Sequence, residues 1–305
     1  MLAPAKRIPV ILDTDIGGDI DDTWALVMLL NSPELDIRLI LTTGHNTYYK
    51  AQIVARMLEI AGRTDIPIGL GEATSDTAGF QAAWLDSFDM NRYAGDVYRD
   101  GVTKLAQCVM GSPEVVTVIA IGPLGNLAAA LRMQPEIASK ARVIGMHGSI
   151  RKGYFGADRP SREYNVAAQP DAGRQVFAAD WEMTIAPLDT CGTIVLTGEK
   201  YQEVLHSDRP LARALIENYR VWLQARKGMK DVQPGMLFER STLLCDTEAV
   251  YLAFSEELVQ IETLGVTVSE HGDTVIDPGA KPIRCATSWL DFAAFQDILV
   301  RRITA

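Results

Sequence analysis

Cysteine and clustered positive charge are both scarce in this sequence. The four cysteines (Cys108, Cys191, Cys245 and Cys285) are scattered without CxxC spacing, which disfavours a disulfide framework or a zinc site and predicts reduced thiols in a cytoplasmic protein. The formal net charge is -10 and no Lys/Arg cluster occurs, so we expect neither nucleic acid nor an anionic membrane as a partner. No apolar run has the length of a transmembrane helix, and segment 1–7 shows no apolar signal segment.

Short apolar, β-branched runs alternate with amphipathic stretches through the first two thirds of the chain. Strands are predicted at 8–12, 37–42, 66–70, 115–121, 141–146 and 183–186. Helices are predicted at 23–31, 48–61, 101–110, 124–133 and 171–179. This alternation is typical of βαβ units, so the predicted fold is α/β, with an open, mostly parallel twisted sheet and helices on both faces.

The final third has a different pattern. It predicts helices at 210–226, 246–254 and 289–301, and a hairpin that pairs 261–268 with 273–276 through a turn at 270–273. No linker or internal repeat interrupts the 305 residues. We therefore expect a single domain over 1–305 with appended C-terminal helices and a hairpin.

Five aspartates follow the first predicted strand within ten residues: Asp13, Asp15, Asp19, Asp21 and Asp22. Like charges this close repel, which indicates a counter-ion, and an all-oxygen ligand set suits Ca²⁺ or Mg²⁺. Helix capping explains the last two aspartates but leaves the first three unexplained. An EF-hand is excluded because Trp24 stands where its closing glutamate should be.

Polar or glycine-bearing segments also follow other predicted strands, at 42–46, 121–123 and 146–148. Ligands bind open parallel sheets at the carboxyl ends of the strands, where such loops converge. Loops separated by a hundred residues are therefore expected to supply one site.

Seven ordered segments carry a family resemblance. They are DTD at 13–15 with DD at 21–22, TTGHN at 42–46, GPLGNLA at 122–128, MHG at 146–148, EYNVAAQPDA at 163–172, CDT at 245–247 and LDFAAF at 290–295. Together they resemble the inosine-uridine preferring nucleoside hydrolase family, the N-ribohydrolases, over nearly the whole chain. The resemblance implies a Rossmann-like nucleoside hydrolase fold.

The resemblance also implies a calcium site and a ribose site. Its Ca²⁺ ligands would be the carboxylates of Asp15, Asp22 and Asp246 and the backbone carbonyl of Ile121. Its ribose-binding residues would be Asp21, Asn46, Met146, Glu163 and Asn165, together with Asp246. Carboxylates accept from sugar hydroxyls, and amides both donate and accept, so this residue set suits a sugar.

The implied reaction is Ca²⁺-dependent hydrolysis of the N-glycosidic bond of a ribonucleoside to ribose and free nucleobase. Asp15 would act as general base on the attacking water. Two alternatives stay open: a nucleoside- or pentose-binding protein with little catalysis, and a Mg²⁺ phosphohydrolase that uses Asp13 as nucleophile. By resemblance, the partner is a small-molecule nucleoside and the assembly a homodimer or homotetramer.

Three departures from the family pattern affect the site. The loop between Asp15 and Asp21 is two residues longer than usual and contains Gly18 and Asp19. Cys245 occupies the position where many members carry a histidine that protonates the leaving base, so His147 and His45 are alternative proton donors. The family asparagine that contacts the 5′-hydroxyl has no clear equivalent in segment 156–159.

Aromatic side chains are expected to stack on the nucleobase. The candidates are Trp84, Phe88, Tyr154, Trp222 and Phe238. Segments 72–99 and 226–238 are the predicted lids.

Overall fold

A ten-stranded sheet runs through residues 6–305, the part of the chain that this computed structural model describes. The strand order is β4-β3-β2-β1-β5-β6-β7-β10-β8-β9. The strands are β1 (Ile8–Thr14), β2 (Leu35–Thr42), β3 (Ile68–Leu70), β4 (Val97–Tyr98), β5 (Val116–Ala120), β6 (Ala141–Gly145), β7 (Glu182–Ile185), β8 (Val259–Val268), β9 (Thr274–Ile276) and β10 (Pro282–Trp289). From β4 to β10 every neighbouring pair is parallel, which confirms the predicted α/β class.

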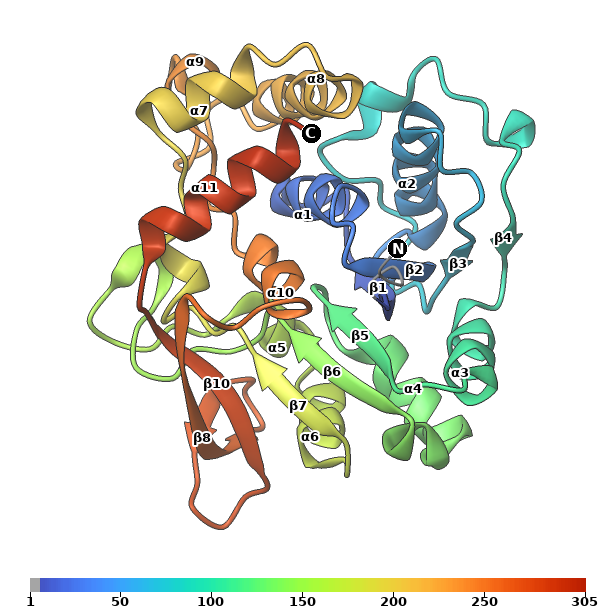
Figure 1. The fold of residues 1–305 in the computed structure, drawn as a ribbon, viewed down its shortest axis with the longest axis vertical. Coiled ribbons are helices and arrows are strands. Elements are labelled where there is room, and N and C mark those ends of the chain that lie inside the picture. Colours follow the sequence, from blue (N-terminus) through green and yellow to red (C-terminus); the bar gives the residue numbers. More distant parts are fainter. Residues whose placement is uncertain (1–5) are drawn as a thin grey trace, which may run out of the picture.

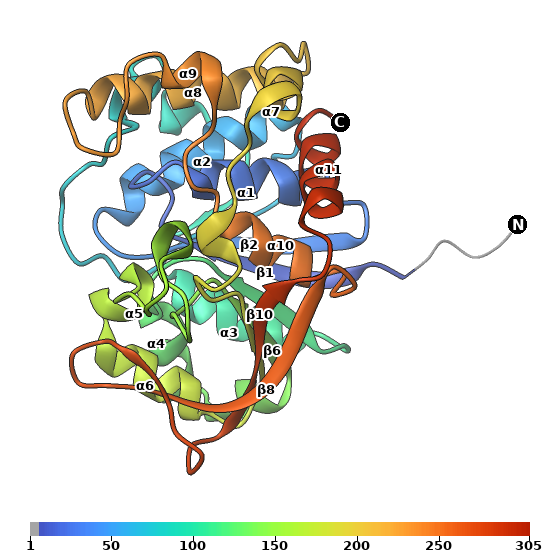
Figure 2. The same cartoon turned by 90° about the vertical axis from the view of Figure 1, so that its left-hand side faces the viewer.

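Helices cover both faces of this sheet, as Figures 1 and 2 show. They are α1 (Asp21–Leu30), α2 (Thr47–Ala61), α3 (Gly101–Gly111), α4 (Gly125–Met133), α5 (Tyr164–Ala168), α6 (Pro170–Ala178), α7 (Gly198–Leu205), α8 (Pro210–Ala225), α9 (Met236–Glu239), α10 (Asp246–Leu252) and α11 (Phe292–Ile303). One apolar core contains the buried side chains of α1, α2, α7, α8, α10 and α11. A second core, on the other face, contains those of α3, α4 and α6.

The C-terminal hairpin is part of the main sheet. The predicted pairing of β8 with β9 is confirmed, and it is antiparallel. A strand that the sequence did not predict, β10, pairs in parallel with β7 and antiparallel with β8. The hairpin therefore extends the sheet edge where an appended element was expected.

The topology brings the carboxyl ends of β1, β2, β5 and β6 to one edge. The register pairs Asp13 with Leu41 on β2 and with Ala120 on β5, so the loops that follow these strands start side by side. Beyond the strands, Thr43 N donates to Thr14 O and Ile121 N donates to Asp13 O. This edge is where a ligand site is expected in a parallel sheet.

Across residues 6–305, no helix combines the length and hydrophobicity needed to cross a bilayer. The expectation for segment 1–7 concerns mainly residues 1–5, which lie outside the described residues.

Candidate active site

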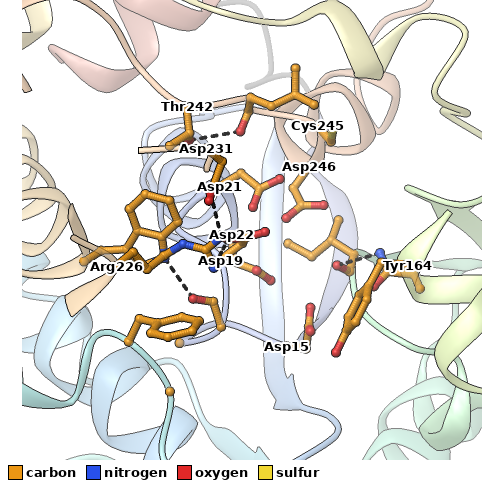
Figure 3. Close-up of a pocket in the computed structure, with 18 of the residues that line it drawn as sticks. Asp15, Asp19, Asp21, Asp22, Tyr164, Arg226, Asp231, Thr242, Cys245 and Asp246 are labelled. Carbon is orange, nitrogen blue, oxygen red and sulfur yellow. Dashed lines mark hydrogen bonds and ion pairs between the residues drawn. The ribbon is translucent and has the colours of Figure 1, made fainter. Parts of the chain in front are cut away.

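A cavity of about 720 Å³ opens at the carboxyl edge of the sheet. Segments far apart in sequence line it, and Figure 3 shows their side chains around one opening. Its lining includes Asp15, Asp19, Asp21, Asp22, His45, Lys50, Phe80, Ile121, Met146, Tyr154, Phe155, Glu163, Tyr164, Asn165, Trp222, Arg226, Asp231, Met236, Arg240, Cys245 and Asp246.

Three carboxyl groups converge in this cavity: Asp21, Asp22 and Asp246. One ligand oxygen from each lies within 4.8 Å of the other two. All three residues stand in the first turns of α1 and α10, which pack against each other. The positive ends of the two helix dipoles therefore favour negative charge at this point.

Burial, the largest cause, and repulsion from neighbouring aspartates raise the pKa of all three carboxyl groups well above the ordinary value. A cluster of buried acids that repel one another is electrostatically incomplete by itself. Because the donors are all hard oxygens, the cluster fits a divalent cation such as Ca²⁺ or Mg²⁺. The structure thus brings the predicted ligands Asp22 and Asp246 together and adds Asp21, which the resemblance had placed on the ribose.

Asp15 lines the same cavity but is not a member of this group of three. Burial raises the pKa of its carboxyl, and the nearby Lys50 acts to lower it. The Lys50 ammonium donates to the Asp15 carbonyl oxygen at 2.7 Å and lies 4.0 Å from its carboxylate Oδ2. Asp15 is therefore a carboxylate in the same cavity as the three clustered aspartates, and the Lys50 ammonium is its positively charged neighbour.

Asn165 and Glu163 form the wall on the side of β5 and β6. Asn165 Nδ2 donates to the carbonyl oxygens of Ile121 at 3.3 Å and Met146 at 3.1 Å. Glu163 caps α5 and accepts from three backbone N–H groups, those of Gly148, Asn165 and Val166. Burial raises the pKa of Glu163 to about 7, although these three hydrogen bonds act to lower it.

Two residues predicted for the site do not line the cavity. Asn46 caps α2: its Oδ1 accepts from Tyr49 N at 2.9 Å and its Nδ2 donates to the Asp76 carbonyl. His147 is fully buried, and its Nε2 bonds the Gly122 carbonyl at 3.0 Å. Burial lowers the pKa of His147 to about 4, so the ring is neutral at physiological pH. Neither residue is among those that line this cavity, so their predicted roles in the site stay predictions.

Asp13 is a structural residue. Its carboxyl group is buried away from the cavity and accepts from Asn126 Nδ2 at 2.8 Å. Burial raises its pKa to about 7, and the Asn126 hydrogen bond opposes this. A phosphohydrolase with Asp13 as nucleophile is therefore inconsistent with the structure, because a nucleophile must reach its substrate.

Cys245 lines the cavity directly before Asp246, and His45 stands at its exposed rim. A hydrogen bond with the Cys191 thiol lowers the pKa of Cys245, but burial and neighbouring acids raise it above the ordinary value overall. The His45 ring lies 3.3 Å from both Ser75 Oγ and Tyr164 Oη, and its backbone φ of 41° is unusual for a residue with a side chain.

The two-residue insertion reaches across the cavity to α8. Trp222 Nε1 donates to the Gly18 carbonyl at 3.0 Å, and Arg226 Nη1 lies 3.4 Å from Asp19 Oδ1. Gly17 permits the turn into the insertion with a φ of 102°. The longer loop therefore joins the early carboxylate segment to the late helical region.

The aromatic lining differs in part from the prediction. Tyr154 and Trp222 line the cavity, whereas Trp84, Phe88 and Phe238 do not. Sequence reasoning missed Phe80, Phe155, Tyr164 and Arg226. Phe80 and Arg226 belong to the two predicted lid segments, but nothing in their local pattern singles them out.

A comparison with protein families agrees with this geometry. The model of the inosine-uridine preferring nucleoside hydrolases matches residues 10–297, nearly the whole chain. The chain belongs to this family. Nucleoside hydrolases cleave the N-glycosidic bond of ribonucleosides and are in general metal-dependent, so the protein is a hydrolase that acts on N-glycosyl compounds.

Individual nucleoside hydrolases are similar over almost their full length. The pyrimidine-specific ribonucleoside hydrolase RihA of Citrobacter koseri is 28% identical, with 97% of this chain and 98% of the relative covered. The probable uridine nucleosidase 2 of Arabidopsis thaliana is 25% identical, with 95% and 92% covered.

Solved nucleoside hydrolase structures share the fold. The plant nucleoside hydrolase PpNRh1 superposes with a TM-score of 0.81 at 23% identity, covering 98% of this chain and 100% of that chain. The purine-preferring ribonucleoside hydrolase from Gardnerella vaginalis superposes with a TM-score of 0.78 at 23% identity, covering 97% and 98%.

Proposed function

We propose that this nucleoside hydrolase requires Ca²⁺ and uses Asp15 as the general base for the attacking water. The observation that carries the proposal is the convergence of Asp21, Asp22 and Asp246 beside Asp15 in one cavity. Four acids from two distant segments are otherwise a costly arrangement, because burial disfavours their charged forms.

The cation would be held by Asp21, Asp22 and Asp246, with the Ile121 carbonyl at the edge of the same space. Bound there, it would supply positive charge that holds a water and the sugar diol together and makes the water more acidic. Ca²⁺ takes about six to eight oxygen ligands, so ribose hydroxyls and water fit the remaining positions of such a site.

The side chains that line the cavity would supply the other catalytic functions: proton abstraction, sugar binding and charge stabilisation. Asp15 takes a proton from the attacking water, and Lys50 favours the charged form of Asp15 that this role needs. Glu163 and Asn165 line the cavity where they can bind the sugar hydroxyls, and Asn165 Nδ2 lies 3.4 Å from Met146 Sδ. Attack at the anomeric carbon develops positive charge on the sugar, which the surrounding carboxylates stabilise.

Cys245 would face the leaving base from its place next to Asp246. Because its pKa lies above the ordinary value, the thiol stays protonated at neutral pH and can donate a hydrogen bond. It is a weak acid for proton transfer, so the base needs a second source of stabilisation.

A direct test incubates the protein and its Asp15→Asn variant with a panel of ribonucleosides and Ca²⁺, and assays reducing sugar. Release of ribose by the parent protein, with a loss of about 10²–10⁴-fold in the variant, supports the proposal. Nucleoside binding without ribose release would instead favour a binding protein on the same fold.

A further inference from the structure

We propose that Arg226 contacts the departing nucleobase and stabilises the negative charge that develops on it, an inference that rests on the function proposed above. Hydrolysis breaks the bond from C1′ to the base nitrogen and forms a bond from C1′ to the water oxygen. Both electrons of the broken bond go to the base. Asp15 receives one proton of the water, and the base regains a proton from solvent after it leaves.

Arg226 lies in the cavity wall at the C-terminal end of α8. Its guanidinium carbon is 4.7 Å from the ring centroid of Trp222 and 4.8 Å from that of Phe80. Figure 3 shows Arg226, Asp19 and Asp231 in the same opening as the three aspartates Asp21, Asp22 and Asp246. The cavity therefore contains, besides the three clustered aspartates, a guanidinium next to two aromatic rings.

Two carboxylates fix the guanidinium in this position. Arg226 Nη1 lies 3.4 Å from Asp19 Oδ1, and Nη2 lies 2.5 Å from Asp231 Oδ2. The Nε atom is buried and has no hydrogen-bond partner within residues 6–305. A guanidinium has five N–H donors, so the two ion pairs leave donors for an acceptor on a ligand.

Two other cationic side chains, Lys50 and Arg240, also line the cavity. Lys50 donates to the Asp15 carbonyl oxygen, and Arg240 Nε donates to the Ser241 carbonyl oxygen. Arg226 is the cation whose position next to the aromatic wall suits a planar, electron-rich base.

This role would assist departure of the base at a site that lacks the family histidine, whose position is Cys245. His147 does not line the cavity, and His45 stands at its exposed rim. An arginine is always protonated, so it acts by charge and hydrogen bonding and does not transfer a proton. A preorganised donor aimed at developing negative charge typically contributes about 10²–10³-fold in kcat.

The test compares two substrates with different leaving groups. Uridine needs help to expel its base, whereas para-nitrophenyl β-D-ribofuranoside expels a stable phenolate without it. Both are assayed in calcium-containing buffer with the parent protein, Arg226→Gln, Arg226→Lys and the matched control Lys227→Gln. Lys227 is the next residue along the chain; it is exposed and does not line the cavity. Lys227→Gln removes one positive charge, as Arg226→Gln does, but leaves the cavity lining intact.

We expect Arg226→Gln to lower kcat for uridine by about 10²–10³-fold and to leave kcat for the nitrophenyl riboside unchanged. Arg226→Lys should retain part of the uridine activity, and Lys227→Gln should match the parent on both substrates. The ratio of the two rates within one preparation is independent of how much of the variant folds.

Equal losses of Arg226→Gln on both substrates would overturn this inference alone, because they would indicate a structural role. An effect confined to KM for uridine would also overturn it. If the parent protein cleaves neither substrate, the proposed function fails and this inference fails with it.

Discussion

Lys50 holds Asp15 at two points, with a 2.7 Å hydrogen bond to its carbonyl oxygen and a 4.0 Å approach to its carboxylate. Because Lys50 lowers the pKa of Asp15, Lys50→Met should raise that pKa further. A general base works only when it is deprotonated, so the acid limb of the kcat/KM profile should move to higher pH.

The measurement for Lys50→Met is kcat/KM for a nucleoside as a function of pH, at fixed calcium. Lys104→Met is the control, since Lys104 packs over Tyr98 and does not line the cavity. A profile of Lys50→Met that coincides with that of the parent would show that Asp15 is not the base.

Gly122 allows close approach to Asp15. A Cβ atom at this position would lie 2.8 Å from Asp15 N and 2.9 Å from Asp15 Cβ. Gly122→Ala should therefore displace Asp15 and lower kcat by about 10²-fold, the cost expected of a misplacement near 1 Å.

The matched control for Gly122→Ala is Gly111→Ala. A Cβ atom on Gly111 meets nothing within 4 Å. Steady-state kinetics on both variants make the comparison, and similar kcat values for the two would contradict the assigned role of Gly122.

Asn126 connects three segments of the sheet edge. Its Nδ2 donates to Asp13 and to the Thr42 carbonyl, and its Oδ1 accepts from Glu72 N. Asn126→Ala leaves the buried Asp13 carboxyl without its hydrogen-bond partner, so it should lower the free energy of unfolding by about 1–3 kcal/mol.

Urea denaturation of Asn126→Ala measures this loss. Asn91→Ala, at an exposed position of the 3-10 helix Met90–Arg92, should change the free energy of unfolding by no more than about 0.5 kcal/mol. Equal free energies of unfolding for Asn126→Ala and the parent would mean that the Asp13–Asn126 hydrogen bond does not stabilise the fold.

Burial of His147 should make the protein less stable as the pH falls. Its pKa is about 4 in the folded protein against an ordinary value of 6.5, because burial disfavours the charged ring. Between these values the unfolded chain binds the proton and the folded chain does not, so stability falls as pH falls from 6.5 to 4. The accumulated loss is about 3 kcal/mol below pH 4, and no effect is expected above pH 6.5.

His147→Gln should remove this component. The unfolding free energy of variant and parent is measured in urea from pH 7.5 to pH 4. The difference between the two at each pH gives the contribution of His147, because the contributions of acids such as Glu163 are common to both proteins. The pKa of Glu163 is raised to about 7, so that acid destabilises the fold as pH rises through this range. A difference that stays constant with pH would contradict the assignment.

Much of the fold follows from local pattern. The apolar runs predicted the six central parallel strands, and the start of α1 at Asp21 agrees with the acidic residues before its apolar face. β10 escaped prediction because Pro282 opens it and Arg284 interrupts its apolar residues. Its place in the sheet depends on pairing with β7 and β8, which no local pattern encodes.

The part of the site that could be predicted from the residues alone is the early aspartate segment, because helix capping does not explain all of its negative charges. The aspartate cluster indicated a cation, but the approach of Asp246 from the far end of the chain came from the family resemblance. Asn46 caps α2, and its transferred role in ribose binding stays a prediction, because an amide can cap a helix or bind a sugar with the same atoms. Arg226 escaped because it ends an ordinary amphipathic helix.

The central claim is that Asp21, Asp22 and Asp246 hold one divalent cation. Calorimetric titration of the calcium-free protein with Ca²⁺ tests it, with Asp246→Asn as the disrupted variant and Asp208→Asn, which does not line the cavity, as the control. We predict one Ca²⁺ per chain for the parent and for Asp208→Asn, and no measurable binding for Asp246→Asn. Unchanged binding in Asp246→Asn, or no binding in the parent, would contradict the account.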